Sequence, residues 1–239
     1  MNVVTLASRK GGAGKSTLTA HLAAHAHRSG VRCMVVDADP QGSLTLWHSL
    51  RGHGGIDGGF DLRNAAQGVD RLLAHAQIEG VEWVFIDTPP TMWVVVGEAI
   101  RAATLVVIPA RPSLFDLSAV RETVATARER DKPYAVVLNA APVKRDDKEA
   151  PVVTQARSHL DALGIPVWAG QISQRAAYSL TLADGGSASE DEPQSTAASE
   201  ISRLWTAVSR SVEVVNAAQA NGGDGSGPAG SKAMQTRAA

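Results

Sequence analysis

The sequence of 239 residues contains a single cysteine, Cys33. One cysteine cannot form a disulfide within the chain, and it cannot supply the thiolate set of a zinc or iron–sulfur centre. A disulfide-stapled fold and a cysteine-held metal cluster within this chain are therefore excluded. Such sparse cysteine usage is typical of a reducing compartment, and we expect a cytoplasmic protein.

Long apolar runs and an excess of either charge are also missing. No run approaches the roughly 20 residues that span a bilayer, and the N-terminus lacks a signal-peptide pattern. Lys and Arg number 23 against 24 Asp and Glu, so the net charge of −1 excludes a histone-like protein but allows a local basic patch. The hydrophobic content of 44% and mean hydropathy of −0.07 are typical of a globular protein.

Composition divides the chain into two parts. Residues 219–239 are rich in glycine and almost free of large apolar side chains, so we expect a disordered tail there. Residues 1–218 are long enough to form one domain with a sizeable core.

Short apolar runs alternate with segments of helical spacing along this domain. Each run is apolar throughout, as in strands that are buried on both faces of a parallel sheet. The spacing predicts helices at 16–28 and 117–130, a last strand near 166–169 and an amphipathic helix carrying Ile201, Leu204, Val208 and Val212. We therefore predict an α/β fold with a doubly wound, mostly parallel sheet. The predicted buried strands are 3–6, 33–36, 84–86, 105–108 and 135–138.

The first predicted strand runs into a glycine-rich loop that opens a helix. Its Gly14-Lys15-Ser16 end matches a phosphate-binding loop, although Arg9 stands where the common pattern has glycine. Backbone amides of such a loop surround phosphate oxygens, a lysine reaches the outer phosphates and a hydroxyl binds Mg²⁺. We therefore predict an ATP and Mg²⁺ site that includes Gly11, Gly12, Ala13, Gly14, Lys15, Ser16 and Thr17.

A second lysine, Lys10, precedes this loop, and the run from Lys10 to Ser16 resembles the deviant Walker A motif of the ParA/MinD family of P-loop ATPases. The resemblance covers residues 1 to about 205. It implies slow, Mg²⁺-dependent ATP hydrolysis and an ATP-dependent homodimer in which Lys10 reaches the phosphates held by the other subunit. A cation supplied in trans can neutralise charge that one subunit does not neutralise alone.

Acidic residues follow two of the predicted strands. Asp37 and Asp39 come after the second one, in a segment that resembles the family's switch I. The resemblance makes Asp39 the residue that orients the attacking water, and we expect Asp37 to support Mg²⁺ and the loop. Capping of an ordinary Asp-Pro turn is the alternative. Asp87 ends the third predicted strand as in a Walker B motif, where it would hold Mg²⁺ through a water.

The remaining candidates lie further along the chain. The segments after the last two buried strands resemble the base side of the family's pocket, so we expect Asn139, Pro109 and Arg111 to contact the nucleotide, with the Asn139 amide reading the adenine edge. Arg175 matches a position through which small ParA proteins bind DNA without sequence preference. Lys144, Arg145, Lys148, Arg157, Arg203 and Arg210 are possible helpers or ordinary solvated charges.

The pattern is most similar to short ParA proteins, because the phosphate loop begins too near the N-terminus for a preceding DNA-reading domain. The resemblance implies a nucleoid-associated ATPase that segregates or positions a plasmid, chromosome or protein cargo, with hydrolysis stimulated by a ParB-like or cargo-adaptor partner. Two alternatives stay open. One is a metabolic P-loop ligase or kinase; the other is a MinD-like membrane ATPase, which the lack of an apolar stripe in residues 219–239 disfavours.

Overall fold

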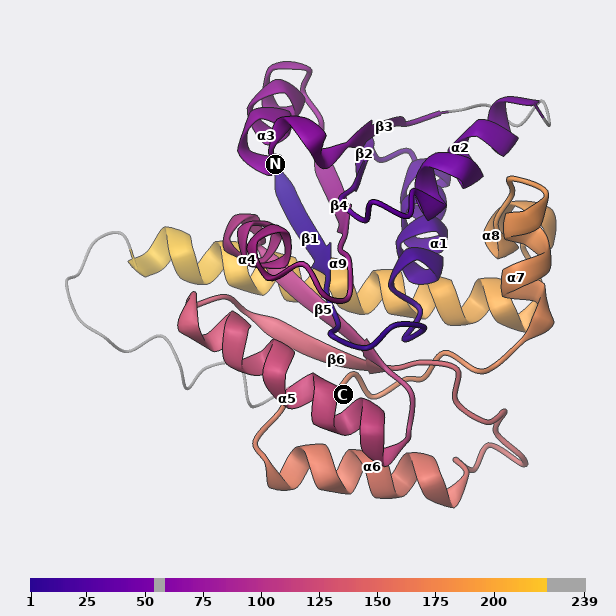
Figure 1. The fold of residues 1–239 in the computed structure, drawn as a ribbon. Helices are drawn as coiled ribbons and strands as arrows, with labels where there is room; N and C mark the ends of the chain where they lie inside the picture. Colours follow the sequence, from indigo (N-terminus) through magenta and orange to yellow (C-terminus); the bar gives the residue numbers. More distant parts are fainter. Residues whose placement is uncertain (54–58, 223–239) are drawn as a thin grey trace.

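The computed structural model describes residues 1–53 and 59–222, which are built around a six-stranded sheet (Figure 1). All neighbouring strands are parallel, in the order β3-β2-β4-β1-β5-β6. The carboxyl ends of the strands therefore share one edge, where parallel α/β sheets bind their ligands. The strands are β1 (Asn2–Leu6), β2 (Cys33–Asp37), β3 (Asp61–Asn64), β4 (Trp83–Asp87), β5 (Leu105–Ala110) and β6 (Tyr134–Leu138).

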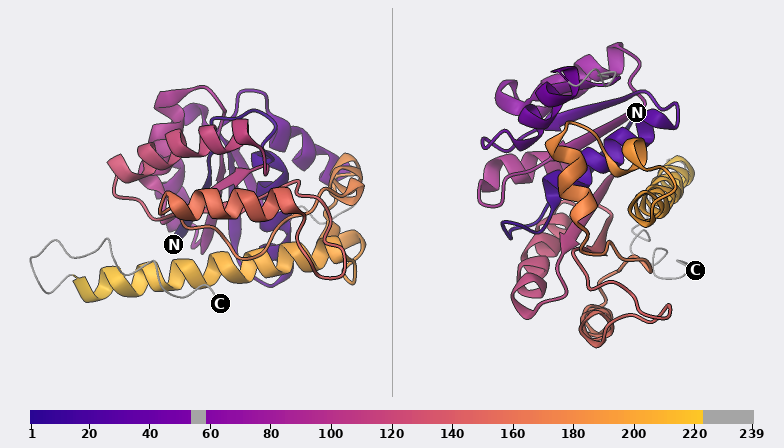
Figure 2. Two further views of the ribbon diagram at one scale, coloured as in Figure 1. Left: turned by 90° about the horizontal axis from the view of Figure 1, so that it is seen from below. Right: turned by 90° about the vertical axis from the view of Figure 1, so that its right-hand side faces the viewer.

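Helices cover both faces of the sheet, as Figures 1 and 2 show. One face packs against α1, α9 and parts of α2 and α7, and the other against α3, α4, α5 and α6. The described helices are α1 (Lys15–Arg28), α2 (Ser43–His53), the 3-10 turn η1 (Ala65–Gln67), α3 (Val69–Ile78), α4 (Trp93–Ala102), α5 (Leu114–Glu129), α6 (Pro151–Ala162), α7 (Ala176–Ala183), α8 (Ala188–Asp191) and α9 (Thr196–Gly222).

The apolar runs explain this layering. In β1, Val4 and Leu6 contribute to the core beneath α1 and α9, while Val3 contributes to the core beneath α3 and α4. Side chains alternate between the faces of a strand, so a run that is apolar throughout needs cover on both sides. The predicted doubly wound α/β fold is confirmed.

The last helix, α9, runs along one face of the sheet (Figure 2). Its four predicted apolar positions, Ile201, Leu204, Val208 and Val212, are all at most 4% exposed. Trp205 of α9 also contacts Trp83 of β4 edge to face, with ring centroids 4.7 Å apart. The predicted amphipathic helix is therefore confirmed. None of the helices in 1–53 and 59–222 has the length and apolar character that a membrane crossing requires.

Two expectations about the elements were wrong, and one strand was missed. The residues at 166–169 do not form a strand and contribute only an isolated bridge between Val167 and Val136. The missed strand is the polar β3, which pairs with β2 in a register that places Met34 opposite Asp61. Helix α5 begins at Leu114 and not at residue 117 as expected, because the Ser113 hydroxyl accepts the Asp116 amide and caps the helix there.

The boundary of the expected tail also changes. Residues 219–222 continue α9, because good helix formers such as alanine and glutamine extend a helix that packing has already nucleated. Residues 223–239, the remainder of the segment expected to be disordered, lie outside the described part of the chain.

Candidate functional site

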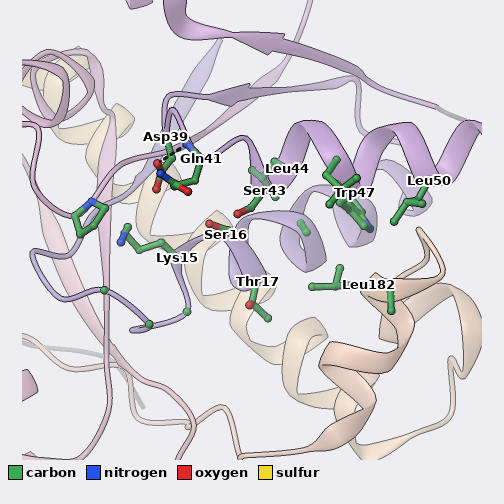
Figure 3. Close-up of a pocket in the computed structure, with 17 residues that line it drawn as sticks. Lys15, Ser16, Thr17, Asp39, Gln41, Ser43, Leu44, Trp47, Leu50 and Leu182 are labelled. Carbon is green, nitrogen blue, oxygen red and sulfur yellow. Dashed lines mark hydrogen bonds between the residues drawn. The ribbon is translucent and has the colours of Figure 1, made fainter.

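The loop between β1 and α1 forms the floor of a cleft of about 500 Å³ at the carboxyl edge of the sheet (Figure 3). Glycines make this loop possible, because Gly12 and Gly14 have φ angles of +74° and +96°. A Cβ on Gly14 would also lie 2.0 Å from Nδ2 of Asn139. Of the predicted loop residues, Gly11, Gly12, Gly14, Lys15, Ser16 and Thr17 line the cleft, and Ala13 is buried beneath it.

Lys15 is the buried cation of the cleft, with 6% of the residue exposed. Burial lowers the pKa of its ammonium group, and the negative charges of Asp87 and Asp39 act in the opposite direction. A positive charge at the N-terminus of α1, where the helix dipole adds positive potential, is suited to bind an anion such as a phosphate.

Ser16 and Asp87 lie together beside Lys15. The Ser16 hydroxyl donates to Oδ2 of Asp87 over 2.5 Å, whereas the buried Oδ1 has no hydrogen-bond partner within the described ranges. Burial raises the pKa of Asp87 to about 7, although the Ser16 hydrogen bond and the Lys15 charge lower it. A hydroxyl next to a carboxylate oxygen that lacks a donor fits Mg²⁺, which prefers oxygen ligands.

These residues could hold Mg²⁺ only together with other oxygens. No group of three or more His, Cys, Asp or Glu side chains in 1–53 and 59–222 could hold a metal ion. Mg²⁺ usually keeps several waters and is bound by one or two carboxylates plus substrate phosphates. Once bound, the ion would neutralise charge that develops on the phosphates.

Asp37 has a different role from Asp39. Asp37 is fully buried, and its Oδ2 accepts the amide and hydroxyl of Thr45 over 2.9 and 2.8 Å while its Oδ1 accepts the Asp39 amide over 3.3 Å. Both of its carboxylate oxygens therefore fix the loop and the first turn of α2, as a helix cap does. Asp39 lines the cleft, where its Oδ1 accepts the Gln41 amide (Figure 3).

The residues expected on the base side only partly gather at the loop. Asn139 is 8% exposed and donates from Nδ2 to the Ala13 carbonyl over 2.7 Å. Arg111 approaches Gly12, whose added Cβ would lie 3.5 Å from a guanidinium nitrogen. Pro109 lies inside β5 and is buried there, so its side chain is not part of the cleft wall.

Lys10 and Arg9 lie at the outer side of the loop. Lys10 is exposed, in contrast to Lys15. Arg9 places its guanidinium 3.0 Å from the ring centroid of Trp93, at the start of α4, and forms an ion pair with Glu122. The departure from glycine at position 9 is thus accommodated by a cation–π contact with the segment that follows Asp87.

Arg175 lies outside this cleft, at the N-cap of α7. Its guanidinium donates to Glu200 of α9, a residue that is 4% exposed, and 24% of the Arg175 side chain is exposed to solvent. The same carboxylate accepts the Ser173 amide and the Tyr178 hydroxyl.

Sequence reasoning missed the second wall of the cleft. Trp47 and Leu50 of α2 face Leu182 of α7 across it (Figure 3). The helical spacing of Leu44, Trp47 and Leu50 was a signal for an apolar face, but the pairing of that face with α7 joins segments more than 130 residues apart.

The parallel sheet, the glycine loop before α1, and the Lys15, Ser16 and Asp87 group define a P-loop nucleotide-binding protein. Residues 4–187 match the family described as the CobQ/CobB/MinD/ParA nucleotide binding domain. The chain belongs to this family.

Known relatives support the assignment. The maintenance of carboxysome distribution protein A of Gloeobacter kilaueensis is 32% identical over 186 residues, which are 77% of this chain and 82% of the relative. The chromosome-partitioning ATPase Soj of Thermus thermophilus is 32% identical over 153 residues, which are 53% of this chain and 61% of the relative. An ATP complex of a McdA variant from Cyanothece shares the fold with a TM-score of 0.67, at 16% identity over 87% of this chain and 96% of that one.

Proposed function

We propose that this protein is a ParA-like ATPase that forms an ATP-dependent homodimer, binds DNA without sequence preference and segregates or positions a plasmid, chromosome or protein cargo. The observation that carries the proposal is the pair of lysines on one loop. Lys15 is buried in the cleft and Lys10 is exposed at the outer side. Lys15 serves the phosphates of its own subunit, and Lys10 those of a second copy of this chain.

The hydrolytic step follows from the remaining groups. Ser16 and Asp87 hold Mg²⁺ with the phosphates, Asp37 supports the Mg²⁺ site and the loop, and Asp39 orients the attacking water. Aligning water next to a phosphate demands position more than strong basicity, which a carboxylate at the mouth of the cleft provides. Arg111 and Asn139 bind the base side of the nucleotide.

Release from DNA requires a second protein in this proposal. A ParB-like or cargo-adaptor partner stimulates slow hydrolysis, and the protein acts in the cytoplasm on the nucleoid. Arg175 contacts DNA phosphates at the dimer surface, where its ion pair with Glu200 fixes the direction of the guanidinium. The names of two relatives, one for carboxysome distribution and one for chromosome partitioning, support a positioning role without deciding between cargoes.

A metabolic P-loop ligase or kinase is the second candidate, and one observation favours it. The cleft extends past Lys15 between Trp47 and Leu182, which leaves an apolar space next to the phosphate site. A small second substrate would fit there. Such an enzyme would turn over rapidly as a monomer, with no need of Lys10 from another subunit.

Sedimentation of variants with ATP and Mg²⁺ tests the dimer. We expect Asp39→Ala to be a dimer with ATP and a monomer with ADP, because phosphate contacts are kept while water is no longer oriented. Adding Lys10→Ala to this variant should abolish the dimer, whereas Lys148→Ala, at another exposed lysine, should not. An Asp39→Ala protein that stays monomeric in saturating ATP would contradict the proposal.

A further inference from the structure

We infer that the buried ion pair between Arg51 of α2 and Glu190 of α8 is a positioning contact for hydrolysis, because it sets the direction of the helix that follows the Asp39 turn. The inference rests on the proposed role of Asp39. It adds two residues that are not part of the P-loop and do not line the cleft.

Asp39 is connected to α2 through three residues. The Gly42 amide donates to the Asp39 carbonyl over 2.9 Å, and the Gly42 carbonyl accepts the Leu46 amide within the first turn of α2. The turn between Asp39 and Ser43 is thus continuous with the helix. A change in the direction of α2 therefore moves Asp39 relative to Lys15.

The beginning of α2 is fixed by Asp37. This fully buried carboxylate accepts both the amide and the hydroxyl of Thr45. An attachment at the first turn leaves the direction of a helix to its later contacts, which in α2 are a hydrogen bond of the His48 ring and the contacts of the buried Trp47 and Arg51. Trp47 and Arg51 attach α2 to the segment between α7 and α8, roughly half a turn and nearly two turns beyond Thr45.

Arg51 makes the second attachment. Its guanidinium donates to both oxygens of Glu190 over 2.9 and 2.7 Å and to the Gly185 carbonyl over 3.0 Å, and its side chain has no exposed surface. The Trp47 indole donates to the Gly186 carbonyl over 2.9 Å. Bidentate pairing of this kind fixes direction as well as distance.

Backbones also meet closely at this attachment. A Cβ on Gly185 would lie 2.5 Å from the Arg51 amide nitrogen, and Gly185 has a φ angle of +76°. Only glycine leaves room for this approach. The segment between α7 and α8 and the middle of α2 therefore pack against each other without an intervening side chain at that point.

The segment that receives α2 is itself held on α1. The buried His21 ring lies between the Tyr178 carbonyl, 3.2 Å from Nε2, and the Ala188 amide, which donates to Nδ1 over 3.3 Å. Burial lowers the pKa of His21 to about 4, so the ring is neutral and can accept from one side and donate to the other. Since α1 begins with Lys15, the lysine and the anchor of α2 belong to one rigid unit.

A buried ion pair is a weak source of stability, because desolvation offsets the attraction between the charges. Its effect is to specify one geometry. The acidic partner is ionised here: burial raises the pKa of Glu190, and the hydrogen bonds and charge of Arg51 more than offset this. Leu50 of α2 and Leu182 of α7 also line the cleft, at the end away from Lys15 (Figure 3).

The chain offers a matched control for this pair. Arg157 of α6 donates to both oxygens of Glu149 and to the Trp168 and Gly170 carbonyls, so it has a similar set of partners. Its helix packs in the core beneath α5 and contributes nothing to the cleft. Replacing Arg157 therefore reports the general cost of breaking a paired guanidinium.

The test compares Arg51→Met with Arg157→Met in three measurements: thermal unfolding, affinity for a non-hydrolysable ATP analogue, and single-turnover ATP hydrolysis with Mg²⁺. We expect both variants to unfold at lower temperature. Only Arg51→Met should slow hydrolysis, by about tenfold or more, because small displacements of a positioning group are costly in rate. Its analogue affinity should stay near that of the wild type, and Arg51→Lys should recover part of the rate.

If Arg51→Met fails to fold, two other variants test the contact: Glu190→Gln keeps the side-chain shape without the charge, and Trp47→Phe removes the indole donor to the Gly186 carbonyl. Each should slow hydrolysis, as Arg51→Met does. Equal hydrolysis rates in wild type, Glu190→Gln and Arg51→Lys, or equal slowing by Arg157→Met, would overturn the inference. Failure of the proposed function looks different: wild-type protein would then bind the analogue without hydrolysing ATP.

Discussion

At the scale of single residues, the phosphate loop shows how much a local motif can predict. Lys15, Ser16 and the loop glycines were predicted because the chemistry needs them at fixed spacing, and they line one cleft. Contacts between distant residues could not be predicted in the same way. The hydrogen bond from Asn139 to Ala13 joins positions 126 apart, and nothing in either local sequence specifies it.

The buried Asp87 carboxyl predicts how the stability of the protein depends on pH. Its carboxyl pKa of about 7 in the folded protein lies above the ordinary value of 3.8, so the folded state binds a proton that the unfolded chain releases. The contribution of Asp87 to stability is therefore complete below pH 4 and disappears as pH rises through 7, a decrease of roughly 4 kcal/mol in the free energy of unfolding.

Urea unfolding of the nucleotide-free protein between pH 4 and 8 measures most of this decrease. Asp87→Asn should flatten the curve relative to the wild type, because the amide has no such titration. Mg²⁺ should also strengthen ATP binding more at pH 8 than at pH 6, since only the ionised carboxylate attracts the ion. If the free energy of unfolding depended on pH in the same way in the wild type and in Asp87→Asn, the raised pKa of Asp87 would be contradicted.

At the scale of elements, the five apolar strands were predicted from the sequence, whereas the polar strand β3 was not. Strand β3, with Asp61, Leu62, Arg63 and Asn64, is recruited by pairing with β2 and has little apolar signal of its own. The residues at 166–169 show the reverse, because an apolar pattern there leads only to an isolated bridge. Strand pairing at a sheet edge is decided by neighbours more than by local preference.

The packing of α9 predicts a contrast between its two sides. Leu204 is 1% exposed in the core shared with α1 and β4, whereas Val214 is 58% exposed. We expect Leu204→Ala to lower the free energy of unfolding by about 2–4 kcal/mol through the cavity it leaves. Val214→Ala should change it by less than about 0.5 kcal/mol. Urea unfolding at pH 7 measures both values, and equal decreases would contradict the packing of this helix.

At the scale of the whole molecule, the family and the nucleotide cleft follow from the chain itself, whereas the proposed dimer and the proposed DNA surface involve other molecules. Lys10 is exposed and Arg175 is partly exposed, so each has surface available for a partner. Their proposed roles depend on residue type and on the resemblance.

The central claim concerns an ATP switch that controls DNA binding, and it is tested most directly by titrating arbitrary duplex DNA at several salt concentrations with ATP, with ADP and without nucleotide. We predict binding with ATP alone, without sequence preference. Its affinity should fall with salt, and Arg175→Ala should reduce the log–log slope by about 0.9 for each DNA phosphate that is no longer neutralised, unlike Arg32→Ala just before β2. Wild-type protein that binds ATP and leaves DNA unbound in every nucleotide state would contradict the account.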